Sequence, residues 1–167
     1  TFSSLVWDSL GRLQSATVSG SGVTDQYVYN PSNQRVWRNN QWFVRGAGGE
    51  VLAIYQWNAG TQTFSFVRRY GYFAGRVVGQ KEDRLGTVQT GSRVYPYGEE
   101  SPTTAQDENK FATYRRDGNT GLDYALNRYY WSALGRFVSP DPFRGSATAA
   151  RSGSWNRYGY VEGDPAN

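Results

Sequence analysis

The chain has 167 residues, a length typical of a single domain, and carries 18 basic and 14 acidic side chains for a net charge of +4. It contains no Cys and no His. These absences exclude disulfides, thiolate metal sites, thiol nucleophiles, Ser-His-Asp catalysis and most zinc sites. Any catalysis must therefore use Asp, Glu, Arg, Tyr, Ser or Lys side chains, and we expect no cofactor.

Aromatic residues make up 16 % of the chain, and 20 residues are Gly. Rings pack well across the strands of a pleated sheet, and dispersed glycines suit short strands joined by tight turns, so the composition predicts an all-β fold. The scattered basic residues favour arginines stacked on sheet aromatics over a nucleic-acid-binding surface. No apolar run approaches the ~20 residues of a membrane span. Because the sequence lacks Met, we expect it to be part of a longer protein.

Residues 1–82 carry a degenerate repeat. Each unit has an alternating, aromatic-rich strand, then Asp, Asn or Gly, a turn at Gly or Asn, and a second alternating strand, which is the pattern of an antiparallel β-hairpin. We expect the Asp or Asn to hold the turn by accepting backbone N–H groups, not to act as an acid or base. The units are Leu5–Leu13, Tyr27–Trp37 and Trp42–Tyr55, with a fourth hairpin expected from Thr63–Tyr72 and Arg76–Gln80 around Ala74-Gly75.

Signals for helices are scarce in the remaining sequence. The polar stretch 103–110 is expected to be a loop or a short helical turn. Residues 155–161 are expected to form one short helix after a cap at Ser154 or Asn156, although Gly159 disfavours it. The sequence thus predicts antiparallel hairpin repeats followed by a region with at most one or two short helices.

Residues 83–167 contain distinctive motifs in a fixed order. These are Asp83–Val88 (DRLGTV), Tyr95–Glu99 (YPYGE), Thr120–Tyr124 (TGLDY), Asn127–Tyr130 (NRYY), Gly135–Pro142 (GRFVSPDP) and Asn156–Asn167 (NRYGYVEGDPAN). In order and spacing they resemble the RHS-repeat-associated core, and the repeats of residues 1–82 are similar to YD-type repeats. The resemblance therefore implies a division into YD-type hairpins over 1–82 and an RHS core over 83–167.

This resemblance implies part of a long antiparallel sheet that spirals into a hollow shell, with the core as a plug at its end. Such shells occur in polymorphic toxins, in the C components of Tc toxins and in teneurins, and in toxins they enclose a variable C-terminal cargo. The implied partners are the rest of the shell and that cargo, with a second copy possible at open sheet edges. The implied location is the surface or exterior of a bacterium.

In several RHS toxins the core resembles an aspartic protease that cuts once, in cis, just after the core. The resemblance assigns one acid to Asp141, with Asp123, Asp117 or Asp164 as the second, and Arg136 as a residue that either holds a carboxylate ionised or orients the chain. Two close carboxylates share a proton and so supply an acid and a base without His. We therefore expect Asp141, Asp123 and Arg136 to carry out any self-cleavage.

The pattern around Asp141 departs from the cleaving members of the family. Pro140 stands where many of them have Arg, and Gly145 comes one place later than in their D-P-x-G element. The competing interpretation of Asp141 is a turn-forming residue before proline. Arg128, which lies between ring residues, is expected to form a stacked or buried ion pair with an acid.

A different function follows if aromatic side chains are exposed on one face of the sheet. Trp7, Trp37, Trp42 and Trp57 are the candidates that would then stack on sugar rings, with Trp37, Trp42 and Trp57 as the expected site, and the chain would be a carbohydrate- or surface-binding module. No nucleotide site is expected, since the sequence has no phosphate-binding loop motif and Gly46–Gly49 is a turn between strands.

Overall fold

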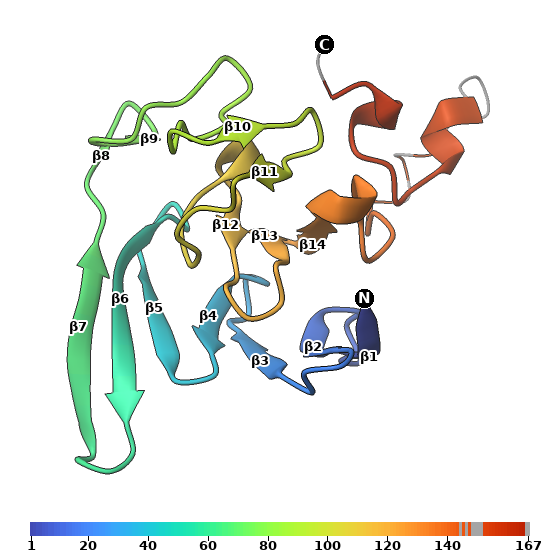
Figure 1. The fold of residues 1–167 in the computed structure, drawn as a ribbon. Coiled ribbons are helices and arrows are strands. Elements are labelled where there is room, and N and C mark those ends of the chain that lie inside the picture. Colours follow the sequence, from blue (N-terminus) through green and yellow to red (C-terminus); the bar gives the residue numbers. More distant parts are fainter. Residues whose placement is uncertain (144, 146, 148–151, 166–167) are drawn as a thin grey trace. The chain divides into compact units, whose positions relative to one another are not determined.

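The computed structural model describes residues 1–143, 145, 147 and 152–165. Over these residues, antiparallel strands build both of the compact units into which the chain divides, Thr1–Gln80 and Lys81–Asn167 (Figure 1). The predicted all-β class with antiparallel hairpins is therefore confirmed. None of the described helices is long and apolar enough to cross a membrane.

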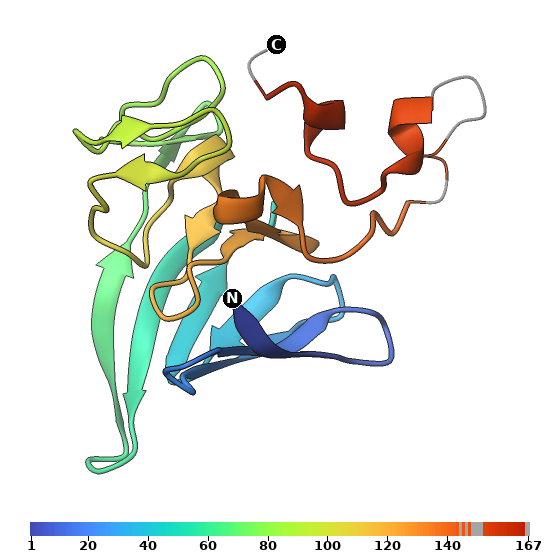
Figure 2. The same cartoon turned by 45° about the vertical axis from the view of Figure 1, so that its right-hand side comes forward.

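The first unit is built around a seven-stranded sheet whose strands follow one another in chain order. The strands are β1 (Phe2–Trp7), β2 (Leu13–Val18), β3 (Thr24–Tyr29), β4 (Arg35–Arg38), β5 (Gln41–Arg45), β6 (Val51–Asn58) and β7 (Thr63–Arg69). Each strand pairs antiparallel with the next, so the sheet is a meander that grows one hairpin at a time. Figure 2 shows the β6–β7 hairpin extending past the end of β5. The first three predicted hairpins are confirmed.

The sheet has one buried face and one exposed face, as strict alternation along a strand requires. Tyr27, Phe43 and Ile54 are buried on the first of these, here called the inner face. A β-bulge where β3 pairs with β4 interrupts the alternation. Because of this bulge, Arg35 and Arg38 both turn to the inner face, where both are buried.

The buried arginines of the inner face contact rings and an acid. The guanidinium of Arg35 lies 4.9 Å from the ring centre of Phe43 and 5.5 Å from that of Tyr27. Arg38 Nε lies 3.9 Å from Asp25 Oδ2, and both side chains are almost fully buried. The expected stacking of arginines on sheet aromatics is thus confirmed, and the buried charge of Arg38 has an acidic partner.

The repeated element is a five-residue hairpin turn. The N–H of its first residue donates to the carbonyl of the fifth residue, and the carbonyl of the first accepts the N–H of the fourth. The fourth residue has a positive φ. This is a type I turn followed by a left-handed residue, a position that favours Gly or Asn. The turn occurs in both units, so the repeat continues beyond residue 82. The copies are Asp8–Arg12, Asn30–Gln34, Gly46–Glu50, Asp83–Thr87 and Tyr95–Glu99.

Carboxylate or amide oxygens hold three of these turns. Asp8 Oδ1 accepts the N–H groups of Leu10 and Arg12, each at 2.9 Å. Asp83 Oδ1 accepts two N–H groups in the same way, and Asn30 Oδ1 accepts one. The predicted role of these side chains as turn-formers is confirmed.

The fourth predicted hairpin is only partly correct. Ala74 and Gly75 form the turn, with φ values of 48° and 78°, but it joins two short strands, β8 (Tyr72–Phe73) and β9 (Arg76–Val77). The long strand β7 ends before them and pairs instead with β6. The strand breaks at Tyr70, whose ring turns into a small core with Phe43 and Ile54.

The second unit combines two small antiparallel sheets with an aromatic core. Its strands are β10 (Arg93–Val94) and β11 (Glu100–Ser101), and β12 (Arg115–Arg116), β13 (Asp123–Ala125), β14 (Arg128–Trp131) and β15 (Arg136–Phe137). Tyr130 is fully buried at the centre of the core, with its ring stacked on Phe111 at 5.4 Å and edge-on to Phe137 at 5.5 Å. The Oη of Tyr130 donates to the carbonyl of Tyr97 at 2.9 Å, so its polar end is satisfied.

The helical segments of the second unit are 3₁₀ turns of three or four residues, and more of them are described than the one or two predicted. They are η1 (Phe111–Thr113), η2 (Ser132–Leu134), η4 (Ser152–Trp155) and η5 (Val161–Gly163). The helix predicted over 155–161 is wrong, because Gly159 forms a β-bridge with Arg136 in the middle of that stretch. The stretch 103–110 is a loop, as predicted.

Candidate functional site

Asp123 lies on β13 directly opposite Arg116 on β12. Arg116 Nε donates to Asp123 Oδ1 at 2.9 Å, and Nη2 donates to Oδ2 at 2.7 Å. Arg116 Nη2 also donates to the carbonyl of Gly98 at 3.0 Å. Both side chains are buried, so the planar guanidinium is used in the two-point geometry that suits a carboxylate.

A second buried acid extends this ion pair into a network. Glu100 Oε2 lies 3.7 Å from Arg116 Nη1, and Glu100 Oε1 accepts from Lys110 Nζ at 3.0 Å. Thr104 Oγ1 also donates to Glu100 Oε1 at 2.9 Å and contacts Lys110 Nζ. Glu100 and Lys110 are only 2 % and 3 % exposed, so the charges of this network compensate one another away from water.

The two acids of the network have pKa values displaced in opposite directions. Burial raises the pKa of Asp123 to about 6, against the lowering effect of the Arg116 hydrogen bonds and charge, and the charges of Asp117 and Glu100 add to the rise. Burial also acts to raise the pKa of Glu100. There the hydrogen bonds from Lys110 and Thr104 and the charge of Lys110 outweigh it and lower the pKa.

Asp141 follows β15 and begins an Asp-Pro turn. Its Oδ1 accepts the N–H of Phe143 at 2.9 Å, which bears out the turn-forming interpretation. Its Oδ2 lies 3.5 Å from Arg128 Nη2, and the Arg128 guanidinium lies 3.6 Å from the ring centre of Phe137. The predicted stacked ion pair of Arg128 is therefore confirmed, with Asp141 as its acid.

A pocket of about 290 Å³ lies beside this ion pair. Asp141 and Arg128 line it together with residues of the segment 153–162, among them Arg157, Tyr160 and Glu162. Among its described lining residues the acids are Asp141 and Glu162. Glu162 thus supplies a carboxylate other than Asp123 among the residues that line the pocket with Asp141.

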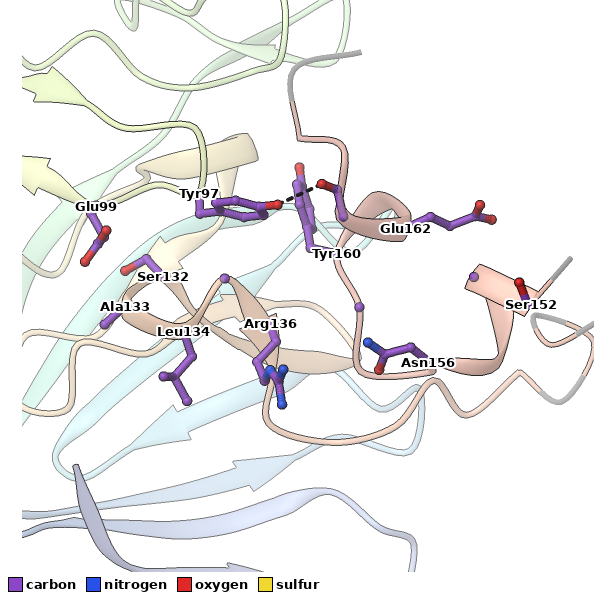
Figure 3. Close-up of a pocket in the computed structure, with 14 residues that line it drawn as sticks. Tyr97, Glu99, Ser132, Ala133, Leu134, Arg136, Ser152, Asn156, Tyr160 and Glu162 are labelled. Atoms are coloured by element: carbon purple, nitrogen blue, oxygen red, sulfur yellow. Dashed lines mark hydrogen bonds between the residues drawn. The ribbon is translucent and has the colours of Figure 1, made fainter.

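Arg136 lines a different, larger pocket of about 580 Å³ (Figure 3). Its side chain is exposed, and Asn156 lies across from it in Figure 3. Tyr97 closes another side of this pocket by donating its Oη to the carbonyl of Gly163 at 2.8 Å. Glu162 lines both pockets, and its side chain extends toward the turn that carries Ser152 (Figure 3).

The three residues assigned to self-cleavage therefore have separate surroundings. Asp123 is fully buried against Arg116, Asp141 pairs with Arg128 at the smaller pocket, and Arg136 lines the larger one. Of the other acids considered, Asp117 is buried near enough to raise the pKa of Asp123, and Asp164 is exposed. A joint catalytic role of Asp141, Asp123 and Arg136 stays a prediction.

Sequence reasoning missed the contributions of Glu100, Lys110 and Glu162. Glu100 and Lys110 come from stretches without an apolar pattern, so nothing in the sequence marks them as buried. A buried Lys paired with a buried Glu arises from tertiary packing. For the described residues, no group of three or more acidic side chains is arranged to hold a metal ion.

Comparisons with known proteins place the fold. No protein-family model matches the sequence. The tRNA3(Ser)-specific nuclease WapA of Bacillus spizizenii is 29 % identical over 174 residues, which cover 98 % of this chain and 7 % of that protein. The solved structure of TcdB2-TccC3 without its hypervariable C-terminal region matches at a TM-score of 0.59 and 18 % identity, covering 96 % of this chain and 10 % of that one.

The Tc holotoxin pore of Photorhabdus luminescens, with a mutation in TccC3, matches in the same way. Its TM-score is 0.57 at 18 % identity, and the match covers 97 % of this chain and 10 % of that chain. The chain thus has the RHS-like all-β fold of a segment of these toxin chains. It spans a tenth or less of the length of the proteins it matches.

Proposed function

We propose that the chain is the closing segment of an RHS-type shell in a secreted or surface-exposed bacterial protein. The unit Thr1–Gln80 contributes strands of the wall, and Lys81–Asn167 is the plug at its end. The observation that carries this proposal is the five-residue turn repeated through both units, in a meander that adds each strand beside the preceding one. A sheet built in this way can be extended by further hairpins of the same kind.

The chemistry of the second unit supports a structural role. Two pairs of buried acids and bases in it form mutual ion pairs, Asp123 with Arg116 and Glu100 with Lys110. Its rings form a packed core around Tyr130. A plug needs such a rigid interior because it must keep its shape against the enclosed chain.

The names of the matched proteins support the proposal that a variable segment follows the plug in the parent protein. One matched Tc structure is named for the hypervariable C-terminal region that it lacks, and the curated relative is named as a nuclease. The present chain covers 7 % of that nuclease, so we assign the nuclease chemistry to no residue here. The parent protein is proposed to carry its cargo C-terminal to Asn167.

Limited proteolysis of the parent protein tests the shell. The segment that follows Asn167 should resist digestion in the native protein and be cut rapidly after denaturation. Arg116→Ala, which breaks the buried network, should expose the segment, whereas Arg93→Ala, at an exposed position of the same unit, should not. Digestion of the segment at the same rate in the native and the denatured wild type would overturn the proposal.

We also propose that the chain cleaves itself after the plug, with the acids that line the smaller pocket as candidates for the reaction. Asp141 takes a proton from water, the water oxygen bonds to the carbonyl carbon of a downstream peptide, and a second acid protonates the nitrogen as the C–N bond breaks. Glu162 is the acid that shares the pocket with Asp141, so it joins Asp123 as a candidate for the second role.

Mass spectrometry of a longer chain tests this step. The wild type should yield a single cut downstream of Asn167, and Asp141→Asn should stay whole. Loss of cutting in Glu162→Gln with retention in Asp123→Asn would assign the second acid to the pocket, and the reverse pattern would assign it to the buried network. An uncut wild type would remove the proteolytic function and leave the shell proposal intact.

A further inference from the structure

The exposed face of the seven-stranded sheet, opposite the inner face and called the outer face, carries a row of rings across neighbouring strands. The strand register places Trp37 opposite Trp42, Trp42 opposite Tyr55, and Tyr55 opposite Phe66. Val28 on β3 continues the row, since it lies opposite Trp37. With strands ~4.8 Å apart, the row is about 20 Å long.

The rings of the row contact one another yet stay open to solvent. Trp42 packs edge-on to Phe64 at 6.2 Å, and Tyr55 packs edge-on to Phe66 at 5.7 Å. Trp57 lies 4.8 Å from Phe64. Trp42, Phe64 and Phe66 are nevertheless 45 %, 54 % and 60 % exposed. A contiguous set of exposed rings of this kind marks a binding surface more often than a scattered one does.

Small neutral side chains make up the rest of the outer face. Ser15 lies opposite Gln26, and Thr17 lies opposite Thr24 with their hydroxyl oxygens 2.9 Å apart. At the positions that the register assigns to this face, all within described strands, one charged side chain occurs, Arg69 at the end of β7. The face therefore offers rings, hydroxyls and an amide with almost no charge.

The combination of exposed rings, hydroxyls and little charge indicates which class of ligand the outer face can bind. A sugar ring has an apolar C–H face that stacks on an aromatic ring and hydroxyl groups that bond to neutral donors and acceptors. A nucleic acid or an acidic surface would require basic side chains, which the face lacks apart from Arg69. The charge-poor composition thus favours a neutral polyhydroxylated ligand.

The dimensions of the row favour a linear polymer over a second protein. A stable protein interface buries about 800 Å² on each partner. A row about 20 Å long and roughly two residue positions wide offers on the order of 200–300 Å². This is too little for a stable dimer, whereas an extended chain of sugar rings needs only a narrow track of rings to stack on.

We propose that the outer face of β3–β7, centred on Trp42 and Tyr55, binds a linear neutral polysaccharide. This inference is independent of the shell proposal, because it concerns only the solvent-exposed side of the first unit. It revises the predicted site: Trp37, Trp42 and Trp57 do lie on one face, and the register adds Tyr55, Phe64 and Phe66 to them.

Affinity electrophoresis through gels that contain a soluble neutral glucan, xylan, mannan or chitin derivative tests the proposal. At least one polysaccharide should retard the wild-type chain, and 1 M NaCl should not abolish the retardation, since stacking carries it. Trp42→Ala should reduce the apparent affinity at least tenfold. Phe73→Ala, at a ring that is 80 % exposed but lies outside the seven-stranded sheet, should bind like the wild type.

Several outcomes would overturn the proposal. One is the absence of retardation by any of these polymers. Another is equal retardation of wild type and Trp42→Ala. A third is a concentration-dependent dimer in sedimentation that Trp42→Ala dissolves, which would assign the face to a second copy of the chain. Circular dichroism of both variants should match the wild type, so that lost binding reports the ring and not the fold.

Discussion

Arg116 and Asp123 face each other across two neighbouring strands and share two hydrogen bonds of 2.9 and 2.7 Å inside the second unit. Arg116 also contacts the Gly98 carbonyl and Glu100, so one guanidinium links the end of a hairpin turn, β11 and β13. These segments are joined through little regular hydrogen bonding, since the strands of this unit are only two to four residues long. The buried ion pairs therefore hold these segments together, as the backbone hydrogen bonds of the long strands do in the first unit.

Replacement of Asp123 tests this role. Asp123→Ala removes both oxygens that accept from the buried Arg116 guanidinium and leaves that charge without its partner, and breaking one side of a buried ion pair costs about 3–5 kcal/mol. We expect the free energy of unfolding, measured by urea denaturation, to fall by that amount. Asp164→Asn, at an exposed acid of the same unit, should change it by less than about 0.5 kcal/mol. Equal effects of the two substitutions would contradict the network.

The opposite pKa displacements of Asp123 and Glu100 predict opposite pH dependences. The pKa of Asp123 is raised to about 6 by burial, so the folded state holds its proton more tightly than the unfolded state. The contribution of Asp123 to stability is complete below pH ~4 and is lost as the pH rises through 6. The pKa of Glu100 is lowered, so its contribution is present above its ordinary value of 4.5 and is lost as the pH falls.

Urea denaturation of wild type, Asp123→Asn and Glu100→Gln between pH 3.5 and 7 measures these trends. The stability of wild type relative to Asp123→Asn should fall as the pH rises from ~4 to ~6, because the buried carboxyl loses its proton, and its stability relative to Glu100→Gln should rise. Each neutral variant removes one titrating group and leaves the others in place. Parallel pH curves for the three proteins would show that the two groups do not titrate as the structure requires.

Much of the fold was predictable because its determinants are local. The pattern of Asp, Asn or Gly followed three residues later by Gly or Asn marks the turns, since a left-handed residue is needed there, as at Gly11 and Asn33. Strand alternation then assigns the faces on both sides of each turn. The break at Tyr70 was not predictable, because its ring leaves the strand to join a core built by distant residues.

The site was less predictable than the fold for the same reason. The family resemblance singled out Asp123 and Asp141 as candidate acids, but it carried no information about which arginine each would meet. The structure gives Arg116 to one and Arg128 to the other. Likewise, the sequence identified Trp42 as a surface ring, whereas the alignment of Trp37, Tyr55 and Phe66 with it depends on the register of three strand pairs.

Gly98 is the turn glycine for which the structure predicts the largest effect. Its φ is +89°, and a Cβ added there would lie 2.6 Å from Cγ of the buried Phe111 ring. Gly98→Ala therefore combines left-handed strain of about 1–2 kcal/mol with a clash against the core. Gly91 has a similar φ of +83° but open space around it, so Gly91→Ala should cost the strain alone.

The difference between these two variants isolates packing from backbone strain. Thermal melting should give a markedly lower transition temperature for Gly98→Ala than for Gly91→Ala. The near-ultraviolet circular dichroism of Gly98→Ala should also change, since Phe111 stacks on Tyr130. Similar melting of the two variants would mean that Phe111 can move aside at little cost.

Asp8 offers a test of the repeated turn in the first unit. Its Oδ1 accepts the N–H groups of Leu10 and Arg12, and its Oδ2 accepts from Arg12 Nε at 2.7 Å. Asp8→Ala removes these bonds at a partly exposed site, so we expect a loss of about 1–2 kcal/mol in urea denaturation. Ser9→Ala, at the exposed tip of the same turn, should have almost no effect.

Asn30 makes the same turn with a neutral side chain, and this difference separates hydrogen bonding from charge. Burial acts to raise the pKa of Asp8, but the hydrogen bonds from Arg12 and Leu10 outweigh it and lower the pKa. The penalty of Asp8→Ala should therefore decline as the pH falls below ~4, because the carboxylate becomes protonated. The penalty of Asn30→Ala, which removes the bond to the Gln34 N–H, should not change over that range. If the losses of unfolding free energy in Asp8→Ala and Asn30→Ala declined equally at low pH, acid would be destabilising the whole sheet. The charge of the Asp8 carboxylate would then make no separate contribution to its turn.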